Sequence, residues 1–177
     1  MGRGRASFRV LVALLWSLPL PVVATPQPAQ TLEYSVKANY LVRFAAFVDW
    51  PPRAFASSQA PVVICVAGRD PFSGALERAA RAQTAHGRGV AVRRPASAAA
   101  AADCHILYVG RGGERLVPEG QSLLVVTDAN VSSERGMIHF AISDDRVRFH
   151  IDLQAASRSG LSISSRLLNL ALSVRGG

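Results

Sequence analysis

Hydrophobic residues recur along residues 31–52 at the spacing of an α-helix. They stand three or four positions apart, and two aromatic residues widen the stripe: Tyr34, Ala38, Leu41, Ala45 and Val48, with Phe44 and Phe47 beside them. This pattern predicts an amphipathic helix of about four turns. The helix is expected to end at Pro51 and Pro52, because proline restricts the residue before it and cannot donate a backbone hydrogen bond.

The next part of the chain alternates short apolar runs with helical segments. The apolar runs predict strands at 61–67, in "RGVAVRR", at 104–109 and at 122–127. A helix is expected from Pro71, capped by Asp70. The alanine-rich residues 97–103 fit either a short helix or a low-complexity loop. The segment "GRGGERLVPEGQ" is too short and glycine-rich for a good helix. Alternating strands and helices predict an α/β fold with a mostly parallel sheet and helices on its faces.

A different pattern follows, in which apolar and polar residues alternate on both sides of a turn. "GMIHFAIS" and "DRVRFHID" predict an antiparallel β-hairpin with Asp144 and Asp145 at its tip. In this register three apolar pairs face each other: Ile142 with Val147, Phe140 with Phe149, and Ile138 with Ile151. A shift of one residue would mix the two faces. The hairpin completes the predicted mixed sheet of a single compact domain.

Two helices are expected after the hairpin. "LQAASRSG" predicts a short helix ending at Gly160, and "SISSRLLNLALSV" a last amphipathic helix capped by a serine.

The first residues have the features of a secretory signal peptide. Three arginines precede an apolar run too short to span a bilayer, and Val22 and Ala24 occupy the −3 and −1 positions of a small-residue cleavage site. We therefore expect a signal peptide at 1–24, a short leader at 25–32 and one domain at 33–175. This predicts an exported, periplasmic protein.

The charge does not favour a nucleic-acid partner. The chain has 20 basic and 12 acidic residues, for a net charge of +8, and removal of the three leading arginines lowers this to +5. Lys37 is the only lysine, and the remaining arginines are spread without a dense run. Scattered arginines are typical of a solvated surface, and export separates the protein from nucleic acid.

Two cysteines, Cys65 and Cys104, lie in apolar segments that predict buried strands. An even pair in an exported chain favours a disulfide, which would be structural or redox-sensitive. A catalytic thiol would need a C-x-x-C motif or an exposed thiolate beside a base, and the sequence shows neither.

Other candidate sites are weak. Gly68 precedes a predicted helix, but "GRDPFSG" matches neither phosphate-binding glycine motif, and Asp70 would repel phosphate. His139 and His150 face each other across the hairpin near Asp152, yet a metal needs more ligands than the sequence supplies. The serines lack a nucleophile motif. The sequence predicts no enzyme, no metal and no cofactor.

Several segments in a fixed order resemble the YfiR family of periplasmic proteins. They span about residues 33–174: "YSVKANYLVRFAAFVDWP", "VICVAGRDPFSGAL", "CHILYVG", "GMIHF", "VRFHIDL" and "SGLSISSRLLNLA". The resemblance implies a repressor that binds the periplasmic sensor domain of an inner-membrane diguanylate cyclase and restrains cyclic di-GMP synthesis and biofilm formation. It also implies that Cys65 and Cys104 match a family disulfide.

The resemblance leaves some features open. The chain lacks a second cysteine pair of the best-known member, and its segment after Gly110 is shorter than in many members. An outer-membrane lipoprotein and a second copy of the chain are further candidate partners. The candidate partner-binding residues are Asp49, Trp50, Arg148, Arg158 and Arg166, although each alone fits a solvated or packing role. The alternative function is a periplasmic small-molecule-binding module coupled to a sensor kinase or transporter.

Overall fold

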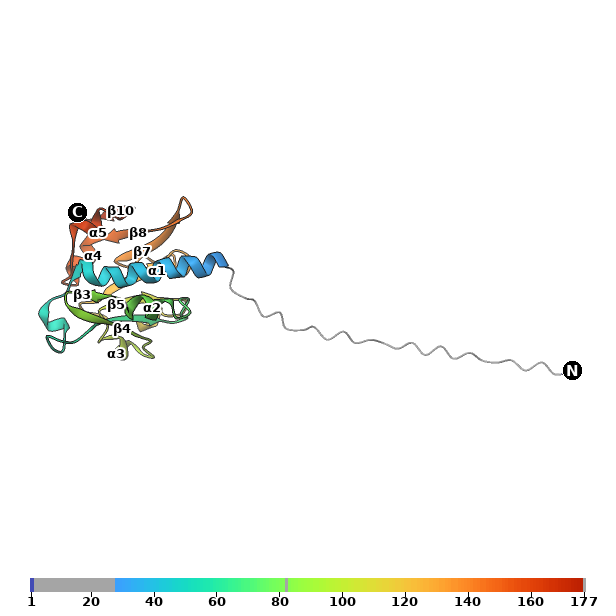
Figure 1. Ribbon diagram of the computed structural model, residues 1–177, viewed down its shortest axis with the longest axis horizontal. Coiled ribbons are helices and arrows are strands. Elements are labelled where there is room, and N and C mark those ends of the chain that lie inside the picture. The colour runs from blue at the N-terminus through green and yellow to red at the C-terminus, as the bar shows by residue number, and fades with distance from the viewer. Residues whose placement is uncertain (2–27, 82, 177) are drawn as a thin grey trace.

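The computed structural model describes residue 1, residues 28–81 and residues 83–176. It contains an eight-stranded sheet with the order β10-β8-β7-β6-β5-β2-β4-β3 (Figure 1). The strands of this sheet are β2 (Val62–Ala67), β3 (Thr84–Ala85), β4 (Arg88–Arg93), β5 (Ile106–Val109), β6 (Leu124–Asp128), β7 (Ile138–Ser143), β8 (Arg146–Asp152) and β10 (Ser173–Arg175). The mixed, mostly parallel sheet with flanking helices confirms the predicted α/β class.

Five neighbouring strands of this sheet are parallel: β4, β2, β5, β6 and β7. Numbered by their order in the chain, they lie in the order 2-1-3-4-5, which is that of a doubly wound fold. The chain moves outward from β2 to β4 and then returns to the other side of β2 to form β5. The point where the winding changes direction therefore lies between β2 and β5.

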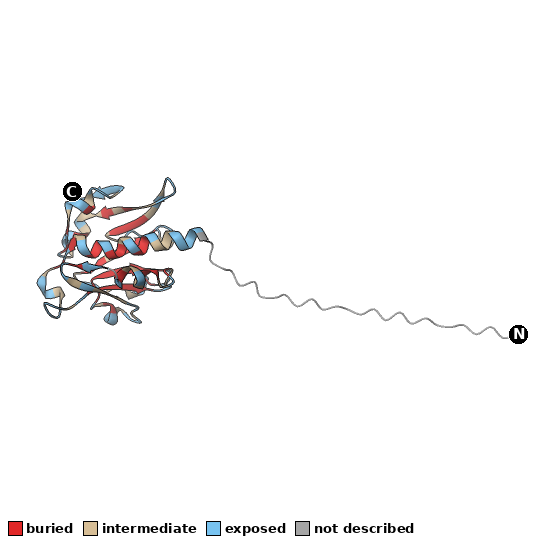
Figure 2. Ribbon diagram, in the orientation of Figure 1, coloured by how far each residue is buried: buried red, intermediate tan, exposed pale blue. Residues whose placement is uncertain are grey.

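The sheet has an apolar layer on each face, and alternate residues of β2 show both. Val62, Ile64 and Val66 belong to the larger core under the first helix, whereas Val63, Cys65 and Ala67 belong to a smaller core on the opposite face. The helices are α1 (Pro28–Phe47), α2 (Ala75–Arg81), α3 (Ala98–Ala101), α4 (Leu153–Arg158) and α5 (Ser165–Leu168), with 3-10 turns η1 (Pro52–Ala54) and η2 (Glu114–Leu116). Figure 2 shows α1 buried along one side and exposed along the other.

The predicted stripe of α1 is confirmed. Ala38, Leu41, Phe44, Ala45 and, just after the helix, Val48 are completely buried. The helix ends at Phe47, just before a two-residue strand β1 (Val48–Asp49), which pairs with β9 (Ser162–Ile163). It begins at Pro28, inside the segment expected to be a leader.

The register of the hairpin is also confirmed, since Ile142 pairs with Val147, Phe140 with Phe149, and Ile138 with Ile151. Asp144 and Asp145 form the turn with φ angles of 50° and 57°. Both angles lie in the left-handed region that a tight two-residue hairpin turn requires and that aspartate tolerates.

Three helix predictions are wrong in their bounds. Helix α2 begins at Ala75 rather than Pro71, because the Asp70 carboxylate accepts a hydrogen bond from the Phe72 amide at 2.7 Å and closes a turn before the helix. The expected terminal helix is reduced to the four residues of α5, and the chain then forms β10 along β8. The helix predicted at 97–103 forms as the shorter α3, capped by Ser97.

The expected signal peptide, apart from residue 1, and residues 25–27 of the leader lie outside the described residues. No helix in the described part of the chain has both the length and the apolar character needed to cross a membrane.

Candidate functional site

The exposed predicted arginines lie toward the C-terminal end of the domain. Arg158 on α4 and Arg166 on α5 are exposed, and Arg148 on β8 is half-buried. Helices α4 and α5 lie close to β10 and the C-terminus (Figure 1). Within the described residues, none of the three guanidinium groups forms an ion pair.

The Asp49–Trp50 corner divides into an exposed and a buried residue. Asp49 pairs with Ser162 in the short β1–β9 ladder, and its side chain is 68% exposed. Trp50 is only 8% exposed, and its indole N–H donates to the carbonyl of His105 at 3.2 Å. The indole therefore packs in the core. In this structure the ring is not accessible to the partner that the sequence analysis proposed for it.

Exposed apolar side chains gather where the chain leaves α5. Leu170 is 54% exposed, Leu172 41% and Val174 39%. The amide of Leu172 donates to the carbonyl of Phe149 at 2.7 Å, which places this segment beside β8. We refer to Leu170, Leu172 and Val174 as the C-terminal apolar patch. β10 is the last strand on its side of the sheet, so its outer edge has no strand partner among the described residues.

Asp152 holds this region together. Its Oδ1 caps α4 by accepting from the amide of Ala155 at 2.8 Å, and its Oδ2 pairs with Arg175 of β10. The hydrogen bond from Arg175, followed by the one from Ala155, lowers the pKa of the Asp152 carboxyl. One carboxylate thus stabilises both a helix start and the edge strand.

The two histidines of the hairpin face each other, as predicted, but other groups hold them. Their ring centroids are 6.4 Å apart, with His139 buried and His150 partly exposed. The Nδ1 of His139 lies 2.7 Å from the Thr127 hydroxyl, and that of His150 lies 2.7 Å from the Ser173 hydroxyl. Burial is the main cause that lowers the pKa of both rings, aided by Arg135.

No group of three or more histidine, cysteine, aspartate or glutamate side chains with metal-binding geometry occurs among the described residues. The histidine pair therefore stands without further ligands in that part of the chain.

The structure joins Cys65 of β2 and Cys104, just before β5, in a disulfide with Cα atoms 5.9 Å apart. Cys65 is fully buried and Cys104 is 5% exposed. The bond links two neighbouring parallel strands on the face of the sheet that carries the smaller core. A redox partner would have to reach this buried bond from the side of Cys104, which lines a cavity.

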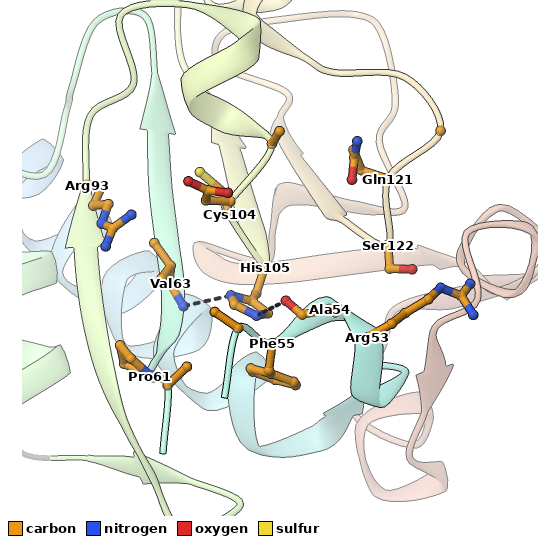
Figure 3. A pocket seen from close by; sticks show the side chains of 15 residues that line it. Arg53, Ala54, Phe55, Pro61, Val63, Arg93, Cys104, His105, Gln121 and Ser122 are labelled. Atoms are coloured by element: carbon orange, nitrogen blue, oxygen red, sulfur yellow. Dashed lines mark hydrogen bonds between the residues drawn. The ribbon is translucent and has the colours of Figure 1, made fainter. Parts of the chain in front are cut away.

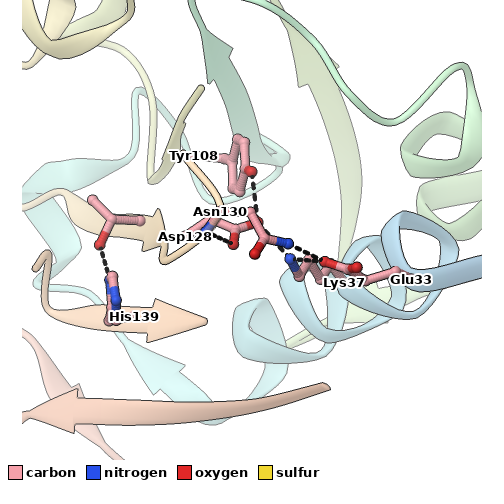
Figure 4. A network of polar contacts seen from close by, with 7 residues as sticks. Glu33, Lys37, Tyr108, Asp128, Asn130 and His139 are labelled. Carbon is pink, nitrogen blue, oxygen red and sulfur yellow. Dashed lines mark hydrogen bonds and ion pairs between the residues drawn. The ribbon is translucent and has the colours of Figure 1, made fainter. Parts of the chain in front are cut away.

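A polar cluster at the carboxyl ends of the strands was missed by the sequence analysis (Figure 4). Lys37 of α1 is completely buried, and its ammonium pairs with Glu33 one turn earlier and with Asp128 at the end of β6, 2.6 Å away. Tyr108 donates to the same Asp128 oxygen at 3.0 Å, and the side-chain Nδ2 of Asn130 donates to Glu33 at 2.7 Å. Burial, with the charge of Asp128 second, raises the pKa of the Tyr108 hydroxyl.

Helical spacing is the signal that could have revealed Lys37. Positions 37, 41 and 44 are separated by four and three residues, so the lysine lies on the apolar face that the sequence already defined. A buried lysine requires a carboxylate as its partner. The sequence could therefore have been searched for an acidic residue at the end of a buried strand.

The opposite end of the sheet contains a cavity of about 610 Å³ near the disulfide (Figure 3). His105 lies at its wall, where Nδ1 accepts from the amide of Val63 at 3.1 Å. This assigns the proton to Nε2, which donates to the carbonyl of Ala54 at 3.1 Å. The ring stacks on Phe55 at 4.3 Å, and the guanidinium of Arg88 lies 4.0 Å from the centre of the Phe55 ring.

Both nitrogens of His105 are occupied, and burial lowers the pKa of its ring. A neutral imidazole with two fixed partners positions the loop that follows α1 against the sheet. It has no free nitrogen for proton transfer or metal binding.

Comparison with protein families gives a match to one family model. A family model described as YfiR/HmsC-like matches residues 34–172, which include most of α1, the parallel sheet, the hairpin and α5. A search of curated proteins found no match to the chain.

Proposed function

Because the chain belongs to the YfiR/HmsC-like family, we propose that it is a periplasmic regulator that binds and inhibits the sensor domain of an inner-membrane signalling protein. The proposed target is a diguanylate cyclase, so that the protein restrains cyclic di-GMP synthesis and biofilm formation. The observation that carries the proposal is the match over residues 34–172, which covers nearly the whole folded domain rather than one motif. Export by the signal peptide at 1–24 is part of the proposal.

The C-terminal apolar patch supports a protein partner. Three exposed leucine and valine side chains lie along the segment that forms the open edge strand β10. Exposed apolar side chains are typical of an interface core, and an unpaired edge strand can extend a partner's sheet through backbone hydrogen bonds. Arg158 and Arg166, both exposed and outside any ion pair of the described residues, add positive charge for an acidic surface.

Binding through such a surface is sufficient for the proposed inhibition, which requires no catalytic residues. A regulator needs to favour one conformation of its target, and a partner that binds the inactive arrangement more tightly shifts the population toward it. Only the difference in affinity between the two arrangements matters. The YfiR/HmsC-like family is regulatory rather than catalytic, and we assign no reaction to this chain.

Deletion of the gene tests the proposal in cells that hold a membrane diguanylate cyclase. Cellular cyclic di-GMP is expected to rise on deletion and to return when the wild-type gene is restored. Restoration with a Leu170→Glu, Leu172→Glu double variant is expected to leave cyclic di-GMP high, although the variant is exported and folded. An unchanged level after deletion would count against the proposal.

A further inference from the structure

A second cavity, of about 400 Å³, opens at the carboxyl ends of the parallel strands. Its lining includes Glu33 and Tyr34 of α1, Arg69 after β2, Arg111 after β5 and Asn130 after β6. Strands β2 and β5 are the two between which the winding changes direction. In doubly wound sheets ligands bind outside the carboxyl ends of the strands near this point. Here the loops after β2 and β5 contact each other, and the cavity lies between them, α1 and the turn after β6.

Glycines fix the two loops that carry the arginines. Gly68 has a φ of +75°, and a Cβ there would lie 2.6 Å from both the carbonyl oxygen of Arg111 and the amide nitrogen of Gly113. Only glycine allows this close approach. The amide of Arg69 then donates to the carbonyl of Arg111 at 3.0 Å. The loops are thus joined backbone to backbone, and both arginines line the same cavity.

The two guanidinium groups have no internal counter-ion. Neither Arg69 nor Arg111 forms an ion pair within the described part of the chain, and both are exposed. The nearby carboxylates are already engaged. Glu33 is bound to Lys37 and Asn130, and Asp128 to Lys37 and Tyr108.

Asp70, which follows Arg69 directly, is engaged as well. It binds Arg94 and the amide of Phe72, so its charge is compensated. The repulsion expected from Asp70 at this loop is therefore reduced. The cavity lining thus holds two guanidinium groups that form no ion pair within the described residues, and one carboxylate, Glu33, which pairs with Lys37.

We propose that this cavity binds a small organic oxyanion, a carboxylate or a phosphate ester, held by Arg69 and Arg111 with its apolar part against Tyr34 and Pro71. Guanidinium groups bind such anions through paired, charge-assisted hydrogen bonds. Tyr34 offers a half-buried ring, and Pro71 an apolar surface, on the wall of the cavity. The site is distinct from the C-terminal apolar patch and needs no protein partner to be tested.

Isothermal titration of the exported chain with phenyl phosphate, benzoate and inorganic phosphate tests the proposal. Phenyl phosphate or benzoate is expected to bind with a Kd below about 1 mM and to raise the Tm, whereas inorganic phosphate binds more weakly. Whichever organic probe binds identifies the class of anion. Absence of binding by both organic probes would overturn the proposal.

Arginine variants distinguish binding of the anion in this cavity from a general attraction of anions to the positively charged protein. An Arg69→Ala, Arg111→Ala double variant is expected to weaken binding at least about tenfold, and Arg69→Lys, Arg111→Lys to weaken it too, since lysine keeps the charge but loses the paired geometry. Arg78→Ala, Arg81→Ala removes the same charge from exposed positions of α2 and is expected to leave binding unchanged. Equal weakening by this control would contradict the site. Near-wild-type Tm values without ligand establish that the variants fold.

Discussion

The ammonium of Lys37, the only lysine in the chain, lies 2.6 Å from a carboxylate oxygen of Asp128, which is 91 positions further along. The pair fastens α1 to the carboxyl end of β6, inside a core where Lys37 is fully buried and Asp128 is 1% exposed. The ammonium also lies 4.8 Å from the centre of the Tyr34 ring, whose pKa is raised to about 12 by burial and then by the charges of Asp128 and Glu33.

Replacement of Lys37 by methionine is expected to destabilise the protein by about 3–5 kcal/mol, because it leaves the Asp128 carboxylate buried without its cation. Urea unfolding measures the change. The matched control, Arg43→Met, removes one positive charge from an exposed position of the same helix and is expected to change stability by less than about 0.5 kcal/mol.

A second replacement distinguishes lost charge from lost packing at this site. In the Lys37→Met, Asp128→Asn double variant the ion pair is removed from both sides, and the amide oxygen of the new asparagine still accepts from Tyr108. More than half of the loss should therefore be recovered. A Lys37→Met protein as stable as wild type would contradict the assignment of a buried ion pair.

Removal of the disulfide by Cys65→Ala, Cys104→Ala should lower the free energy of unfolding by about 4 kcal/mol, because the bond closes a loop across a separation of 39 residues. Urea unfolding in the absence of reductant gives this value. Alkylation of the denatured, unreduced wild-type protein should modify neither cysteine. A label on either one would show that the bond does not form.

Acid is expected to destabilise the protein through its buried histidines. Burial lowers the pKa of His105, so the unfolded chain takes up protons more readily than the folded one below the ordinary histidine value of about 6.5. Stability is complete at neutral pH and falls as pH drops through that value toward the lowered one. Unfolding in urea at a series of pH values between about 7 and about 5 measures the slope.

His105→Gln removes one titrating group and should flatten part of this slope, whereas Gln121→Ala, which removes a non-titrating side chain from the wall of the same cavity, should preserve it. Equal slopes in wild type and His105→Gln would refute the role of His105. Any loss of stability that His105→Gln causes at neutral pH does not affect this comparison, because only the change of the free energy of unfolding with pH is compared.

Asp152→Ala should cost about 1 kcal/mol, the usual effect of losing a helix cap, and should also release β10. Hydrogen exchange reports the second effect as faster exchange in residues 173–175, which lose their ion-paired anchor. Arg146→Ala, at an exposed position of β8, is the control with unchanged exchange there. Unaltered protection of β10 in Asp152→Ala would show that Arg175 does not hold the strand.

The sequence allowed the elements with a strong local pattern to be predicted. The hairpin register followed from a turn at Asp144 and Asp145 together with the alternation, because a slip of one residue would place the apolar residues of β7 opposite polar ones. The stripe of α1 followed from helical spacing in the same way. The α/β class followed from the order of the strands and helices.

Long-range relationships were not accessible in this way. The pairing of Lys37 with Asp128 depends on how α1 lies across the sheet, and the meeting of Arg69 with Arg111 depends on the strand order. The expected terminal helix failed because tertiary pairing competes with local propensity: β8 offers an edge, and residues 173–175 pair with it in parallel. Trp50 had no local signal that separates a packing indole from an exposed one.

Isothermal titration of the chain without residues 1–24 against the periplasmic domain of an inner-membrane diguanylate cyclase from the same organism tests the proposed regulation most directly. Saturable binding is expected, weakened at least about tenfold by Leu170→Glu, Leu172→Glu in the C-terminal apolar patch. Leu32→Glu, Val36→Glu places the same charges at two exposed apolar positions of α1 and should leave binding unchanged. Absence of binding by the folded wild-type chain, or equal weakening by both double variants, would contradict the account.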